Sequence, residues 1–263
     1  MYLAKGTRQT LDLILSNLDT KNKFAYIRIG DGDINLANGE NDSFNVCTPQ
    51  FQAEMKEVFT IDDPGFIKCL PLILEANAEP NMFPGNHLGN QHFYDAMVGR
   101  IRPYLPFFKE VYNPIALCYQ AVYHPDYAIN FLKSLKKACI SNPAWTIGNQ
   151  NINKDLLQML FGSKANYIPT IERNSYSQID QVWNKIVSSA KKDEYNVFVL
   201  FLGCSGRCLA KRIWKTYPNV FVFDFGSLMD ALNGDYTRAW IQLSGFNIPN
   251  FLKQCKAALD EVD

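Results

Sequence analysis

The chain has 263 residues, of which 47% are hydrophobic and 20% are charged, and this composition suits a globular protein with a full core. Lysine and arginine together number 26, as do aspartate and glutamate, so the formal net charge is zero. A balanced chain has no overall attraction to nucleic acid or to an anionic membrane surface, so we expect no nucleic-acid partner.

The N-terminal sequence MYLAKGTRQTLDLILSNLD has neither the long apolar stretch nor the small-residue cleavage site of a signal peptide. No run approaches the roughly 18 apolar residues of a transmembrane helix, so we expect a cytoplasmic protein without an integral membrane segment. The seven cysteines include no C-x-x-C pair, and the three histidines lack the usual zinc-ligand spacings. This pattern favours buried, reduced thiols over a zinc site.

Short apolar runs alternate along the chain with amphipathic stretches whose apolar residues recur every three or four positions. Strands alternating with helices predict an α/β fold, with a Rossmann-like, mainly parallel sheet flanked by helices. We favour a single domain over 1–263, with the Pro- and Gly-rich loop 80–90 as the alternative boundary between two lobes. In chain order we predict helix 8–18, strand 23–29, helix 50–59, strand 66–70, helix 91–101, strand 115–118, helix 126–138, strand 144–147, helix 153–160, strand 165–168, helix 177–190, strand 197–202, helix 206–216, strand 219–224 and helix 249–260.

Two glycines and two aspartates, Gly30, Asp31, Gly32 and Asp33, follow the first predicted strand directly. Ligands of parallel α/β sheets bind where strands end, and the glycines give this turn backbone freedom. Asp31 and Asp33 can then face one hard divalent cation, with diphosphate oxygens completing its shell. The alternative is an ordinary turn. A calcium-binding EF-hand loop is excluded, because its glycine and its final glutamate are replaced here by Leu36 and Asp42.

A second glycine turn, Gly203-Cys204-Ser205-Gly206, follows the apolar strand 197–202 and leads into a helix that Ser205 can cap. The N–H groups at such a helix start suit a phosphate. The next strand ends at Asp224, 21 residues after Gly203, where nucleotide-binding units hold a ribose hydroxyl. The pattern G-x-x-G does not support a dinucleotide site, and a tight turn without a ligand is the alternative.

Together these segments resemble the GT-D-type glycosyltransferases, a family first known as a domain of unknown function. RIGDGDI is similar to the family's R-x-G-D-G-E element, and VFVLFLGCSGRCLAKRI and VFVFDFGSL correspond to its later strands and glycine turn. The mid-chain stretch from IGNQNINKDLLQ to IPTIERNSYSQ is also similar.

The resemblance implies a Rossmann-like fold, a nucleotide-diphosphate sugar donor and a divalent metal, Mn²⁺ or Mg²⁺, at Asp31 and Asp33. The second acid is Glu in the family and Asp here, so its shorter side chain must approach a metal more closely. A histidine that the family has after the last strand has no counterpart in FDFGSLMDALNGDYTRAW, where Asp230 and Arg238 stand instead.

We therefore predict transfer of a hexose from a nucleotide-diphosphate sugar to a hydroxyl of a glycan, glycopeptide or glycoprotein. Two alternatives stay open: an S-adenosylmethionine-dependent methyltransferase, which explains only one of the two glycine turns, and a non-catalytic nucleotide-sugar-binding protein. The oligomeric state, the sugar, the nucleotide base and the stereochemistry are left open. Asp224 and Asp230 are the candidate bases, and the candidate donor-binding residues are Arg28, Gly30, Gly32, Asn149, Arg173, Gly203, Ser205 and Gly206.

Overall fold

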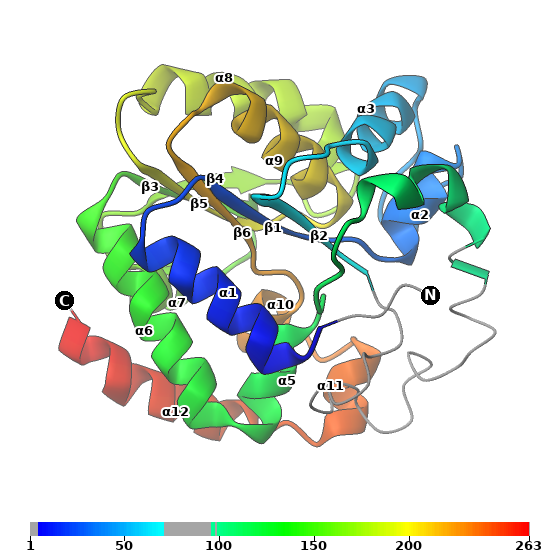
Figure 1. Ribbon diagram of the computed structural model, residues 1–263. Helices are drawn as coiled ribbons and strands as arrows, with labels where there is room; N and C mark the ends of the chain where they lie inside the picture. The colour runs from blue at the N-terminus through cyan, green and yellow to red at the C-terminus, as the bar shows by residue number, and fades with distance from the viewer. Residues whose placement is uncertain (1–4, 71–95, 98, 263) are drawn as a thin grey trace.

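The computed structural model describes residues 5–70, 96–97 and 99–262 and contains one six-stranded parallel sheet (Figure 1). The strands lie side by side in the order β2-β1-β6-β5-β3-β4, and every adjacent pair is parallel. This architecture confirms the predicted Rossmann-like α/β fold. The strands are β1 Phe24–Arg28, β2 Phe66–Cys69, β3 Ala144–Asn149, β4 Asn166–Thr170, β5 Asn196–Phe201 and β6 Val220–Asp224.

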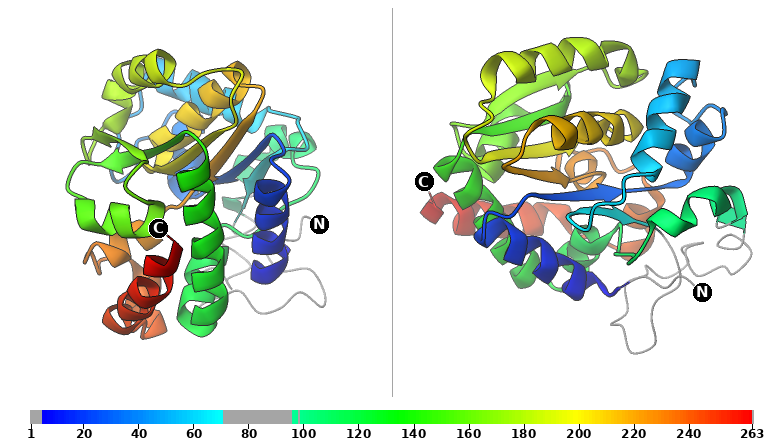
Figure 2. Two further views of the ribbon diagram at one scale, coloured as in Figure 1. Left: turned by 90° about the vertical axis from the view of Figure 1, so that its left-hand side faces the viewer. Right: turned by 45° about the horizontal axis from the view of Figure 1, so that its top comes forward.

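Helices cover both faces of this sheet, and their buried side chains form two separate apolar clusters. The views in Figure 2 show α1, α6 and α12 side by side under one face, while α8 and α9 lie over the other. The first face carries α1 Thr7–Asp19, α5 Ala116–Tyr123, α6 Pro125–Ser141, α7 Lys154–Phe161, α10 Leu228–Leu232 and α12 Ile248–Leu259. The second carries α2 Asp31–Ala37, α3 Pro49–Phe59, α8 Ile179–Ser189 and α9 Cys204–Thr216, and the short α11 Ala239–Ser244 precedes α12.

Strand β5 shows why an uninterrupted apolar run becomes a central strand. Val197 and Val199 point into one cluster, while Phe198 and Leu200 point into the other. Because successive side chains of a strand alternate between faces, only an apolar run can be covered on both sides. The helices follow their predicted periodicity in the same way, as in α8, where Ile179, Val182 and Ile186 are buried.

Most predicted elements are confirmed, and the exceptions have physical reasons. The predicted strand at 115–118 is wrong, because Ala116–Tyr123 forms helix α5, and a short apolar run does not distinguish a strand from a buried helix. The predicted helix 91–101 is described only at residues 96–97 and 99–101, and the predicted loop 80–90 lies outside the described residues. No helix within the described ranges is long and apolar enough to cross a membrane.

Helix α2 was predicted as a turn, because Gly32 and three Asp or Asn residues are poor helix formers. The structure shows instead that the helix begins at Asp31, with Gly30 as its N-cap. The Gly30 N–H donates to Asp33 Oδ2 at 2.8 Å, so the side chain of Asp33 satisfies the N-cap N–H of its own helix. This local bond stabilises a helix that intrinsic preference disfavours.

Candidate active site

A cleft of about 390 Å³ lies at the carboxyl edge of the sheet, where the strands end. The neighbouring strands β5 and β6 lead into helices on opposite faces, because α9 packs in one apolar cluster and α10 in the other. Such a divergence opens a crevice, and open α/β sheets bind their ligands there. The cleft is lined, among others, by the predicted site residues Arg28, Gly30, Asp31, Gly32, Asp33, Asn149, Gly203 and Asp230.

The two carboxylates of the first glycine turn differ in their surroundings. Asp31 is exposed, and its Oδ1 accepts a hydrogen bond from the Gly32 N–H at 2.9 Å. Asp33 is only 1% exposed, and one of its oxygens caps α2. Residues two apart on a helix point in divergent directions, since a turn takes about 3.6 residues. The expected turn that presents both carboxylates to one cation is therefore corrected to a helix start.

Arg207, in the first turns of α9, takes the remaining oxygen of Asp33. Its Nε lies 3.2 Å from Asp33 Oδ1, and its Nη1 lies 3.0 Å from Asp224 Oδ2. The Nε contact satisfies the distance of an ion pair but not the geometry of a hydrogen bond. All three side chains are at most 10% exposed. Burial opposes the charge on Arg207, but Asp224 and Asp33 outweigh it and raise the pKa of the guanidinium.

Asp224 is therefore an internal counter-ion and not a surface of the cleft. It is 3% exposed, and its Oδ2 also accepts from the Arg28 N–H at 3.2 Å. A base must reach the proton of the acceptor, and a buried carboxylate that is held by Arg207 does not. This placement corrects the interpretation of Asp224 as a ribose-binding residue or a candidate base.

We call the second glycine turn open, because no side chain caps the helix that follows it, and the first turn closed, because Asp33 accepts from the Gly30 N–H. Gly203 is the exposed N-cap of α9, has a φ of 58°, and provides no side-chain cap. Ser205 does not cap the helix as predicted. It lies inside the first turn, fully buried, and its Oγ accepts from Ser175 Oγ at 2.9 Å. Gly206 is also buried within α9, and neither Ser205 nor Gly206 lines the cleft.

Arg28 reaches the cleft past a third glycine, Gly226. The Arg28 Nε donates to the Pro114 carbonyl, and its Nη1 lies 3.4 Å from the Phe225 carbonyl. A Cβ on Gly226 would stand 1.2 Å from this Nη1, and Gly226 has a φ of 63°. Only glycine fits this position, so the chain after β6 is shaped around the arginine.

Three loops meet at the rim of the cleft around Phe44. The guanidinium carbons of Arg173 and Arg238 lie 5.3 and 5.2 Å from the centre of its ring. Asn174 holds the Phe44 loop through its N–H, which donates to the Phe44 carbonyl at 2.9 Å. Arg173 thus lies at the rim through Phe44 and is not itself a lining residue. Sequence reasoning missed Phe44, since an isolated aromatic residue in a polar loop carries no pattern.

Asp230 is the acid of the cleft whose chemistry suits proton transfer. Its side chain is 29% exposed, and its Oδ2 lies 3.3 Å from Arg238 Nη2. Burial raises its pKa, and the positive charge of Arg238 opposes this shift without cancelling it. Of the two bases that the sequence nominated, Asp230 is the one that lines the cleft.

The family resemblance implies a divalent metal, and the described side chains do not fit one as they stand. Within residues 5–70, 96–97 and 99–262 there is no group of three or more His, Cys, Asp or Glu residues that could hold a metal ion. Asp33 Oδ1 and Asp224 Oδ1 are buried without a hydrogen-bond partner, but the charge beside them is that of Arg207. A metal on Asp33 would have to displace this arginine.

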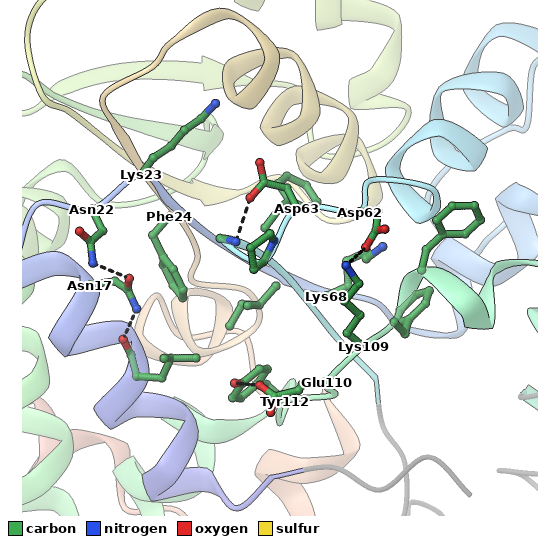
Figure 3. A pocket seen from close by; sticks show the side chains of 17 residues that line it. Asn17, Asn22, Lys23, Phe24, Asp62, Asp63, Lys68, Lys109, Glu110 and Tyr112 are labelled. Atoms are coloured by element: carbon green, nitrogen blue, oxygen red, sulfur yellow. Dashed lines mark hydrogen bonds and ion pairs between the residues drawn. The ribbon is translucent and has the colours of Figure 1, made fainter.

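A second and larger cavity, of about 700 Å³, lies beside the start of β1 and β2 (Figure 3). Two of its lysines already have protein partners. Figure 3 shows Lys109 pointing toward Asp62, and its Nζ lies 2.9 Å from Asp62 Oδ1. The Lys68 ammonium donates to the carbonyls of Phe59 and Ile61. Burial lowers the pKa of Lys68 to about 8. Because this cavity is not at the carboxyl edge, we assign the site to the smaller cleft.

Comparison with known proteins identifies the family of the chain. The family described as "Glycosyltransferase GT-D fold" matches residues 26–231. No curated protein matches the chain. The fold is similar to that of a glycosyltransferase (DUF1792) from Streptococcus sanguinis, with a TM-score of 0.65, 15% identity, and coverage of 92% of this chain and 85% of that one. It is also similar to a structure of domain of unknown function 1792 with a distinct glycosyltransferase fold, with a TM-score of 0.59, 13% identity, and coverage of 89% and 80%.

The matched segment begins within β1, ends within α10 and includes all of the other five strands. The two ends of this segment contribute Arg28 and Asp230, which both line the cleft. The chain therefore belongs to the GT-D family of glycosyltransferases.

Proposed function

We propose that this enzyme transfers a hexose from a nucleotide-diphosphate sugar to a hydroxyl group of a glycan or glycoprotein. The observation that carries the donor class is the presence of three guanidinium groups and one uncapped helix start in a cleft that six acidic side chains also line. Arg28, Arg207 and Arg238 line it, and the uncapped start of α9 at Gly203 opens into it. Guanidinium groups and free helix N–H groups are the ligands that proteins use for phosphates. The acceptor class is carried over from the family resemblance.

In the proposed reaction, Asp230 removes the proton of the acceptor hydroxyl. The acceptor oxygen forms a bond to the anomeric carbon, and the bond from that carbon to the phosphate oxygen breaks. The electron pair leaves with the diphosphate, whose added negative charge is stabilised by the arginines of the cleft. This sequence describes a transfer with inversion, for which a single carboxylate base beside the acceptor suffices.

Mn²⁺ or Mg²⁺ at Asp31 and Asp33 stays a prediction from the family, and no step above passes through it. Asp31 is exposed at the cleft and free to approach a diphosphate-bound ion, whereas Asp33 is engaged by Arg207 and by its own helix. Membership of the GT-D family removes the support for the methyltransferase alternative.

The first experiment is calorimetric titration with a panel of nucleoside diphosphates and nucleotide sugars, followed by an assay for diphosphate release on the best donor. We expect Asp230→Asn to bind the donor within about threefold of wild type and to lose about 100-fold or more in turnover, because only its proton acceptance is removed. Asp235→Asn, a more exposed carboxylate of the same cleft, is the matched control.

Two results would contradict the proposal. If no nucleotide sugar binds, the donor class is wrong. If the wild type binds a donor and never releases the diphosphate with any hydroxyl acceptor or water, the protein is a binding protein and not a transferase.

A further inference from the structure

We propose that Arg207 is the resident cation of the donor site and that donor binding by this enzyme does not depend on a divalent metal. The inference rests on the proposed function, because it names the group that meets the donor diphosphate. The family resemblance leads us to expect an acidic pair around a metal, and the structure places a guanidinium between two acids.

The position of Arg207 is central to the carboxyl edge. It connects Asp33, just after β1, with Asp224 at the end of β6, and these two strands are neighbours in the sheet. Side chains on a helix tilt toward its N-terminus, so an arginine at the fourth residue of α9 reaches back over the helix start. Its Nη1 donates to the Gly203 carbonyl at 2.6 Å, which anchors the guanidinium at the open glycine turn.

The charges around Arg207 disfavour a second cation on Asp33. The carboxylates of Asp33 and Asp224 both pair with the Arg207 guanidinium, and the Arg28 guanidinium lies near enough to Asp224 for their charges to interact. A metal bound to Asp33 Oδ1 would lie within about 5 Å of the Arg207 Nε, given a metal–oxygen distance of about 2 Å and the 3.2 Å ion pair. In a buried site such a like-charge contact is strongly repulsive. The arginine and the metal are therefore alternatives.

Arg207 keeps donors for a ligand although it is paired. A guanidinium has five N–H groups, and its contacts with the described residues use Nε and Nη1. The residue lines the cleft beside Gly203, where the first N–H groups of α9 also lie. A phosphate held there meets the planar fork of an arginine and the positive end of a helix together. Arg207 supplies these donors permanently, without an exchangeable ion.

The test is calorimetry with the nucleoside diphosphate that binds best, in excess EDTA and in excess Mn²⁺. We expect wild type to bind equally in both, within about threefold. Arg207→Gln in EDTA is expected to bind at least about 30-fold more weakly, because it loses a charged hydrogen-bond donor. Mn²⁺ should restore part of that affinity in Arg207→Gln alone, since the carboxylates of Asp33 and Asp224 are then free to hold a metal.

Arg212→Gln is the matched control, because Arg212 lies on the same helix but pairs with Glu54 and Asp180 away from the cleft. It should bind as wild type does. Arg207→Gln leaves two buried carboxylates unpaired, which can prevent folding. In that case the double variant Arg207→Gln/Asp224→Asn is used, because it removes one charge of each sign. Its affinity in EDTA should fall as far.

Three outcomes overturn the proposal: wild type loses its affinity in EDTA, wild type without nucleotide binds one equivalent of Mn²⁺, or a folded Arg207 variant binds like wild type. Each of these leaves the glycosyltransferase function intact. If wild type binds no nucleoside diphosphate with or without Mn²⁺, the proposed function itself fails, and the role of Arg207 fails with it.

Discussion

The two glycine turns of this enzyme look alike in sequence and behave differently in the fold. Each follows a buried strand and each begins a helix, α2 after β1 and α9 after β5. The turn at Gly30 is closed by Asp33 of its own helix, whereas the turn at Gly203 has no side-chain cap. Arg207 of the open turn then pairs with Asp33 of the closed one. An acidic pair at a strand end is thus not by itself a metal site, because a neighbouring element can supply its counter-ion.

The largest expected effect separates the two carboxylates of the closed turn. Asp33→Asn removes the buried charge that pairs with Arg207, although its amide oxygen can still accept from the Gly30 N–H, so we expect a loss of about 3 kcal/mol in the free energy of unfolding. Asp31→Asn, at an exposed position, is expected to change it by less than about 0.5 kcal/mol. Urea denaturation of both variants measures the difference. Equal losses would mean that the two acids act as a pair after all.

A smaller effect is expected from adding a methyl group to each turn. Gly203→Ala should lower the free energy of unfolding by about 1–2 kcal/mol, because its φ of 58° is strained for any residue with a Cβ. Gly30 has a φ of −116°, and a Cβ there would meet Asp33 Oδ2 at 3.8 Å, an ordinary contact. Gly30→Ala is therefore expected to be nearly neutral. Thermal unfolding of the two variants would refute this contrast if Gly30→Ala were the more damaging.

The smallest expected effect is a shift in the pH profile, and it concerns Asp230, which faces both turns across the cleft. Burial raises the pKa of Asp230 and Arg238 lowers it, so Arg238→Gln should raise it further. A base acts only when it is deprotonated, so the acidic limb of kcat/KM should move to higher pH. Arg173→Gln, which removes the other arginine on Phe44 without touching Asp230, should leave the limb in place. An unmoved limb in Arg238→Gln would exclude Asp230 as the base.

The sequence alone predicted the sheet and the edge at which the site lies. Six of the seven predicted strands are correct, because a strand buried on both faces has to be apolar throughout, as 197–202 is. Residues at or just after the ends of β1, β3 and β5 were nominated because ligands bind at the carboxyl edge of a parallel sheet, and Arg28, Asn149 and Gly203 do line one cleft. Parallel strands bring their carboxyl ends together whatever the loops contain.

The tertiary structure decided which side chains of that edge remain available to a ligand. Asp33, Asp224 and Ser205 have the right chemistry and follow the right strands, but each is buried and engaged by a partner from another element. Arg207 lies 174 positions from Asp33 in the chain, so no local pattern of residues announces their contact. Local periodicity determines where helices and strands form, whereas pairing between distant charges depends on how those elements pack.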